Sequence, residues 1–140
     1  MKVKDIMSSN VSFVDDSAKI PEIALIMKQQ NIGAVPVVQN NQVTGIITDR
    51  DIVLKVLADK KDVNQTTASQ VMTTHPVCIE ENSNIDQAAN LMAEYQVKRL
   101  PVLSEGKLVG MIALGDLAIE HIHVDEAGEA LSGISKGITH

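Results

Sequence analysis

Residues 45–52 read Gly-Ile-Ile-Thr-Asp-Arg-Asp-Ile, and residues 110–117 read Gly-Met-Ile-Ala-Leu-Gly-Asp-Leu. The two stretches lie 65 residues apart, and the same offset aligns identical residues elsewhere: Met7 with Met72, Ile20 with Ile85, Ala24 with Ala89, Met27 with Met92 and Pro36-Val37 with Pro101-Val102. A fixed internal period indicates one supersecondary unit used twice, and such a unit seldom buries its apolar face alone. We therefore expect two similar repeats.

Each repeat begins with the pattern of a helical turn (residues 3–7; 68–72) and a short strand (residues 12–14; 77–79). Polar stretches at 15–17 and 80–83 are suited to capping a helix, and Pro21 fits only the first helical turn. Apolar residues then recur at helical spacing in both copies: Ile20, Ile23, Ala24 and Met27, and Ile85, Ala88, Ala89 and Met92. This spacing predicts one apolar helix face per repeat.

A hairpin and a second helix complete each repeat. Strands at 34–38 and 100–103 lead into the turn pairs Asn40-Asn41 and Glu105-Gly106, and the apolar run resumes at Val43 and Leu108. Gly45 and Gly110 lie inside the second strands, where glycine marks a bulge or a close backbone approach. We expect second helices near 49–57 and 115–121. The fold class is therefore α/β (α+β), with two βαββα repeats about a pseudo-twofold axis and their sheets face to face.

These patterns divide the chain into a first repeat (1–58), a polar linker (59–67), a second repeat (68–123) and a tail (124–140) that could form a short helix. The net charge of −6 disfavours a nucleic-acid or anionic membrane surface. The lone Cys78 fits a cytoplasmic protein, and no apolar run is long enough to span a membrane. Aromatic residues make up 1% of the chain, so the core must be aliphatic.

The stretch from Gly45 to Ile52 allows two interpretations. Thr48 and Asp51 have the spacing of a capping box, with Thr48 as the N-cap and the Asp51 carboxylate reaching back to it. The same geometry suits a ligand, because free N–H groups at a helix start attract phosphate and a carboxylate can accept both hydroxyls of a ribose. The two roles are compatible, since capping holds the carboxylate still.

Other polar residues carry weaker signals. Lys98 and Arg99 precede a strand and are either solvated or a phosphate clamp, for which the arginine fork is well suited. His121 and His123 lie two apart, which is a poor metal signature because such residues do not share a helix face. His75 before Pro76 is expected to be extended. We expect no metal, no catalytic site and no enzyme activity.

The two Gly-to-Asp stretches, each preceded by an apolar-Pro-Val strand and a methionine-anchored start, resemble a tandem pair of cystathionine-β-synthase (CBS) domains, a Bateman module. The resemblance covers residues 1 to about 121. It implies a regulatory module, often a homodimer, that binds AMP, ADP, ATP or S-adenosylmethionine in clefts between the repeats and acts on a partner protein. It implies no other cofactor.

The resemblance also implies roles for individual residues. In the stronger cleft, Asp51 would bind the ribose, Thr48 and Arg99 the phosphate, and Ile46 and Val97 the base, with His75 and Lys98 nearby. The weaker cleft would combine Asp116, Asn10, Ile32 and Ala34. It lacks the family's hydroxyl, which Ala113 replaces, and Gly33-Ala34 supply no cation. The alternative to ligand sensing is a structural or adaptor module that dimerises and whose clefts are vestigial.

Overall fold

A computed structural model describes residues 1–121 of the chain. The expected tail at 124–140, its short helix, His123 and the last residues of the second repeat lie outside the described residues. The chain divides into two compact units, which we describe separately. We call Ser12–Pro76 the first-repeat unit, and Met1–Val11 together with Val77–His140 the second-repeat unit.

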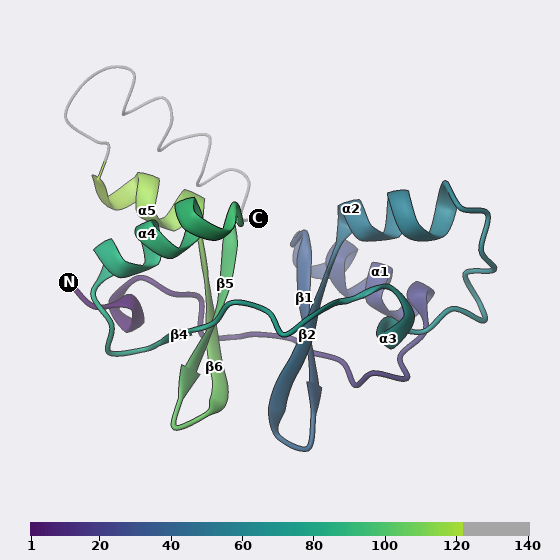
Figure 1. Cartoon of the computed structure of the whole chain (residues 1–140), viewed down its shortest axis with the longest axis horizontal. Coiled ribbons are helices and arrows are strands. Elements are labelled where there is room, and N and C mark those ends of the chain that lie inside the picture. Colours follow the sequence, from purple (N-terminus) through teal and green to yellow (C-terminus); the bar gives the residue numbers. More distant parts are fainter. Residues whose placement is uncertain (122–140) are drawn as a thin grey trace. The chain divides into compact units, whose positions relative to one another are not determined.

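The two units contain matching elements (Figure 1). The first-repeat unit contains α1 (Ile20–Gln30), β1 (Ala34–Gln39), β2 (Gln42–Thr48), α2 (Asp49–Asp51), the π-helical η2 (Ile52–Leu57), α3 (Ala68–Val71) and β3 (Thr73–Thr74). The second-repeat unit contains the 3₁₀ turn η1 (Val3–Asp5), β4 (Ile79–Glu80), α4 (Ile85–Tyr95), β5 (Arg99–Ser104), β6 (Lys107–Ala113) and α5 (Leu114–His121). The predicted α+β class and its repetition are confirmed.

Each sheet is built around the predicted hairpin. In the first-repeat unit the order is β1-β2-β3, and all pairs are antiparallel. In the second-repeat unit the order is β4-β5-β6, with β4 parallel to β5 and β6 antiparallel to it. The strand expected at 12–14 is reduced to one parallel bridge between Val14 and Val37, and Ser8 forms an antiparallel bridge to Met111.

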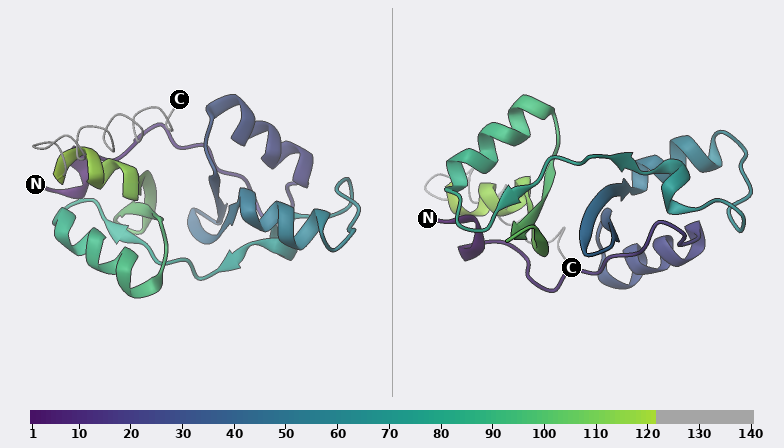
Figure 2. Two further views of the ribbon diagram at one scale, coloured as in Figure 1. Left: turned by 90° about the horizontal axis from the view of Figure 1, so that it is seen from above. Right: turned by 60° about the horizontal axis from the view of Figure 1, so that its bottom comes forward.

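The leading segments of the two sequence repeats are exchanged between the units. The η1 turn buries Val3 in the second-repeat unit, where the Val3 N–H donates to Ser83 O at 2.8 Å. The equivalent α3 buries Ala68 and Val71 in the core of the first-repeat unit. Figure 2 shows the purple N-terminal turn beside the green elements, and α3 beside the blue ones. The sequence repeat and the compact unit therefore do not coincide.

Both cores are aliphatic, as expected from the shortage of aromatic residues. Fully buried side chains include Ile23, Val35 and Ile47 in one unit, and Leu100 and Ile112 in the other. In the second-repeat unit, α4 and α5 lie together against the β5–β6 hairpin (Figure 1). One detail of the predicted helix face was wrong, because Ala24 and Ala89 are exposed.

The expected caps of the long helices were also wrong in detail. The N-cap of α1 is Lys19, without a side-chain cap, and Pro21 lies in the first turn as predicted. Asp15 instead closes a local turn, where its carboxylate accepts from Ser17 N at 2.9 Å and Ser17 Oγ at 2.6 Å. These bonds lower the pKa of Asp15. Helix α4 is capped by Asn84, directly after the expected polar stretch, because the cap must adjoin the first helical residue.

The hairpin turns confirm their predicted chemistry. Asn40 and Asn41 have φ of 54° and 63°, and Glu105 and Gly106 have φ of 52° and 80°. Two consecutive left-handed residues are what a two-residue type I′ turn requires. The expected linker at 59–67 includes a folded turn, in which the Thr66 N–H and hydroxyl both donate to Asp62 O.

The second-strand glycines allow a close approach, as predicted. A Cβ on Gly45 would overlap Met72 Sδ and lie 2.8 Å from Met72 Cγ. A Cβ on Gly110 would lie 2.5 Å from Met7 Sδ and 2.8 Å from the Ser8 carbonyl oxygen. In each unit, the methionine of the exchanged leading segment therefore rests against the hairpin at a position that has no side chain.

Candidate functional site

The corner between β2 and α2 is held by a complete capping box. Thr48 Oγ1 accepts from the Asp51 N–H at 3.1 Å, and Asp51 Oδ2 accepts from the Thr48 N–H at 2.9 Å. The corner is also tied to the start of β1, because the Asp49 N–H donates to Gly33 O at 3.0 Å. The capping-box interpretation is confirmed, and it fixes the Asp51 carboxylate at the end of the strand.

The second carboxylate oxygen of Asp51 is occupied as well. Lys55 Nζ lies 3.1 Å from Asp51 Oδ1, and the same ammonium donates to Val71 O at 3.2 Å. The Asp51 side chain is 14% exposed and that of Lys55 46% exposed. Sequence reasoning missed Lys55, although its i,i+4 spacing from Asp51 on a helix was a usable signal.

Three predicted residues of this unit share one face of the sheet. Thr48 is paired with Ala34, and Ile46 with Pro36. Ile47, which lies between them, is fully buried in the core. Since side chains alternate along a strand, Ile46 and Thr48 lie on the face opposite Ile47, together with Ala34.

The matching corner of the second-repeat unit, between β6 and α5, has one of the two hydrogen bonds of the capping box. Asp116 Oδ2 accepts from the Ala113 N–H at 2.8 Å, but Ala113 has no hydroxyl to return a bond. Burial raises the pKa of the Asp116 carboxyl, and the bond from Ala113 opposes that shift. Arg99 is paired with Ala113, and the Leu114 N–H donates to Lys98 O at 2.8 Å. The backbones of Lys98 and Arg99 therefore adjoin the corner that carries Asp116.

The predicted site residues are divided between the compact units. Ile46, Thr48, Asp51, His75, Ile32 and Ala34 belong to the first-repeat unit, and Asn10, Val97, Lys98, Arg99 and Asp116 belong to the second-repeat unit. Each expected cleft takes residues from both units, so both cleft assignments stay predictions. Within single units, the structure groups Thr48 and Asp51 with Ala34, and Arg99 with Asp116.

Several of these residues have other local roles. His75 is not extended: its φ is 51°, and its N–H donates to Thr44 O at 3.3 Å at the end of the β2–β3 pairing. That expectation was wrong because the sheet edge holds the backbone in a left-handed conformation, which histidine tolerates better than most residues. Ile32 and Val97 pack against the two cores, whereas Asn10 and Lys98 are exposed.

A cluster of metal ligands or a membrane-spanning helix would indicate another kind of site among the described residues. Among residues 1–121, no three His, Cys, Asp or Glu side chains gather in a way that could hold a metal ion. Within the same range, no helix is both long and apolar enough to cross a membrane. A shallow open depression of the first-repeat unit is lined by Lys61, Asp62, Gln65, Thr66 and Gln70, none of which was a predicted site residue.

Comparison with known families identifies the repeats. The CBS domain family matches residues 3–58 and again residues 68–123. The chain therefore belongs to the CBS domain family and carries a tandem pair of these domains. Both matches begin in the leading segments, η1 and α3, that the structure exchanges between the compact units.

Three known proteins are similar to this chain over most of its length. The CBS domain-containing protein YhcV of Bacillus subtilis is 43% identical over 138 residues, which cover 99% of this chain and 98% of YhcV. The crystal structure of Hypoxic Response Protein I with two coordinated zinc ions is 35% identical with a TM-score of 0.78, covering 88% of this chain and all of that one. The CBS domain pair of MJ0100, solved with 5′-methylthioadenosine and S-adenosyl-L-methionine, is 30% identical with a TM-score of 0.76, covering 84% of this chain and 93% of that one.

Proposed function

We propose that this chain is a regulatory module that senses an adenosine-containing ligand (AMP, ADP, ATP or S-adenosylmethionine) between its two CBS repeats. The main support is the β2–α2 corner, where a capping box holds the Asp51 carboxylate beside the face that carries Ile46 and Thr48. A preformed carboxylate at a helix start is suited to the two hydroxyls of a ribose. The MJ0100 pair, whose structure contains two adenosyl ligands, supports the same ligand class.

The stronger ligand site in this proposal combines Ile46, Thr48, Asp51 and His75 with Val97, Lys98 and Arg99. The weaker one combines Asp116 with Asn10, Ile32 and Ala34. Ligand binding regulates by shifting the population of two arrangements of the repeats, and its effect is limited by the ligand's differential affinity for them. The chain then acts on a partner protein in the cytoplasm and is not itself an enzyme.

We also propose a homodimer. The six-residue η2 segment exposes three large aliphatic side chains: Val53 at 52%, Leu54 at 46% and Leu57 at 57%. Leu25 on α1 of the same unit is 51% exposed. A gathering of exposed apolar side chains is typical of a protein interface, and a second copy would cover it.

The second candidate function is an adaptor that dimerises but binds no ligand. Two observations favour it. The Asp116 corner lacks the hydroxyl partner, and in the Asp51 corner both carboxylate oxygens already have protein partners. In this case the helices alone would carry the function, through the exposed η2 side chains.

A thermal-shift titration separates the two functions. A ligand at 100 times its dissociation constant adds about 2.7 kcal/mol to stability. We therefore expect AMP, ATP or S-adenosylmethionine to raise the melting temperature in a dose-dependent way. If none of these, nor ADP or NAD, moves the melting temperature at millimolar concentration, the sensor function is wrong and the adaptor remains. Mass spectrometry of small molecules that copurify with the protein would identify the native ligand.

A further inference from the structure

Lys55 connects two segments of the first-repeat unit at the corner that carries Asp51. Its ammonium group lies 3.1 Å from Asp51 Oδ1 and 3.2 Å from the carbonyl oxygen of Val71, the last residue of α3. One lysine therefore holds the carboxylate of α2 and the end of the exchanged leading segment. Neither the capping box nor the repeat pattern accounts for this contact.

Lys55 lies in a stretch of wide helical turns. In this stretch N–H groups donate to carbonyl oxygens five residues earlier: the Ala58 N–H to Val53 O and the Lys61 N–H to Val56 O, both at 2.9 Å. Turns of this kind are rare and occur frequently at functional sites. Two acceptors fix the ammonium, so Lys55 is less free than an ordinary surface lysine.

The charge of Lys55 changes which ligands the corner can accept. A bare carboxylate that binds a ribose repels a phosphate on the same ligand, because two negative charges are brought into a partly buried place. At Asp51 the ammonium cancels the carboxylate charge, so an anionic ligand meets no net repulsion. A cationic ligand loses the attraction that a bare carboxylate would give it.

The second corner supplies an internal comparison. Asp116 Oδ2 accepts from the Ala113 N–H at 2.8 Å, much as Asp51 Oδ2 accepts from the Thr48 N–H at 2.9 Å. Among the side chains that the structure describes, however, Asp116 has no ion pair. Burial raises the pKa of the Asp116 carboxyl, and the hydrogen bond from the Ala113 N–H opposes that shift. Among the described side chains, the Asp51 carboxylate therefore has an ion pair with Lys55, whereas the Asp116 carboxylate has none, although Arg99 is paired with the neighbouring Ala113.

We propose that Lys55 is a specificity-determining residue that shifts the selectivity of the Asp51 corner toward phosphorylated adenosyl ligands and away from cationic ones, relative to a bare carboxylate. The inference rests on the proposed function, since it names the ligand charge that the same site prefers. It predicts that the Lys55 charge raises the affinity for AMP, leaves that for 5′-methylthioadenosine nearly unchanged and lowers that for S-adenosylmethionine. These three ligands share the adenosine group and differ in charge at the 5′ end.

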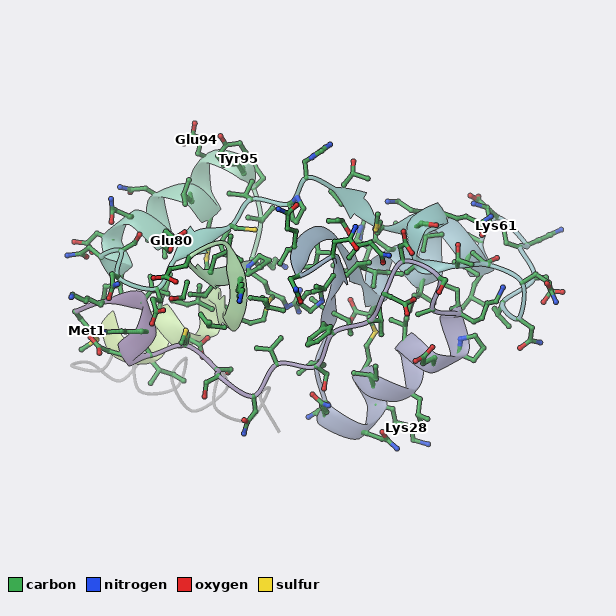
Figure 3. The ribbon with its side chains drawn as sticks, turned by 90° about the horizontal axis from the view of Figure 1, so that it is seen from below. Met1, Lys28, Lys61, Glu80, Glu94 and Tyr95 are labelled. Atoms are coloured by element: carbon green, nitrogen blue, oxygen red, sulfur yellow. The ribbon has the colours of Figure 1, made fainter. Side chains whose placement is uncertain are left out.

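The test is calorimetric titration of the full chain with each of the three ligands. Lys55→Gln keeps a hydrogen-bond donor and removes the charge, whereas Lys55→Arg keeps the charge. Lys61→Gln is the matched control, because Lys61 lies in the same unit and is exposed (Figure 3). Binding at this corner is defined as the component that Asp51→Ala removes.

We expect Lys55→Gln to weaken the binding of AMP about tenfold, which is the effect of one partly screened charge pair. The affinity for 5′-methylthioadenosine should change less than about threefold. S-adenosylmethionine should bind more tightly, and both Lys55→Arg and Lys61→Gln should keep the wild-type order. If Lys55→Gln changes all three ligands equally, or none of them, Lys55 is only a structural link and the inference is overturned. An equal loss of AMP affinity in Lys61→Gln would also overturn it. If the wild-type protein binds none of the three, the proposed function itself fails.

Discussion

The two buried glycines give a sharp test of the packing, because their surroundings differ in one respect. At Gly45 the nearest obstacles to a Cβ are Met72 side-chain atoms, with the Thr73 carbonyl oxygen further away at 3.0 Å. At Gly110 the obstacles are Met7 Sδ and the Ser8 carbonyl oxygen at 2.8 Å. A methionine side chain can be removed by mutation, but a backbone carbonyl cannot.

We expect Gly45→Ala to destabilise the protein by about 1–2 kcal/mol, the cost of overpacking a close contact. In a Met72→Ala background the Sδ and Cγ atoms are gone, and the same substitution should become nearly neutral. The remaining contact with the Thr73 carbonyl oxygen at 3.0 Å is offset by the lower entropy of the unfolded chain, since replacing glycine by alanine at an unstrained φ stabilises by about 0.4–1 kcal/mol. The coupling between Gly45 and Met72 should therefore be about 1 kcal/mol or more.

The second pair should behave differently. Ser8 and Met111 exchange two backbone hydrogen bonds of 2.9 Å, so the Ser8 carbonyl cannot move away from a new Cβ at Gly110. We expect Gly110→Ala to cost about 2–3 kcal/mol both in the wild-type protein and in Met7→Ala. The mutational coupling at this pair should be small.

Urea denaturation of the two double-mutant cycles measures both couplings. Calorimetry gives an independent check, since 1 kcal/mol corresponds to about 3–4 °C in a domain of this size. Equal coupling in the two cycles, or a neutral Gly45→Ala in the wild-type protein, would show that the methionine contacts do not explain the glycines.

Three further predictions concern charge, ligand and assembly. Asp51→Ala should weaken binding of the preferred nucleotide by about 1.5–3 kcal/mol and Asp116→Ala by less, so an equal or reversed ranking in a titration would mean that the stronger site is wrongly assigned. Burial raises the pKa of Asp116 above its usual 3.8. Below pH 3.8 the carboxyl is protonated in both states and costs nothing; the penalty on folding builds up as the pH rises from 3.8 to the raised pKa and is fully present above it. Unfolding curves should therefore show Asp116→Asn gaining stability relative to wild type between acid and neutral pH, and a pH-independent difference would contradict this. If the proposed dimer forms through η2, Leu57→Asp should give a monomer in sedimentation equilibrium without a lower melting temperature, and an unchanged mass would exclude η2 as the interface.

Local patterns in the sequence were sufficient for the repeated elements. Helix spacing predicted α1 and α4, and paired turn residues predicted the two hairpins. The capping box was also predictable, because its atoms come from residues three apart in one turn. In each case, the interactions that decide the structure lie within a few neighbouring residues, so the sequence itself carries the information.

Tertiary structure decided the features that join distant segments. The exchange of η1 and α3 between the compact units is invisible in the repeat, since a 65-residue period is the same whichever unit receives each leading segment. The left-handed φ of His75 depends on an edge pairing with Thr44, which overrides the usual preference before proline.

Lys55 shows most clearly what the sequence decides and what the tertiary structure decides. The sequence by itself determined the i,i+4 spacing from Asp51, and with it one possible ion pair. Only the folded chain brings the Val71 carbonyl, sixteen residues away, to the other side of the same ammonium. The charge that faces Asp51 is therefore fixed by packing between segments, because a long-range acceptor holds a flexible side chain that local geometry would leave in solvent.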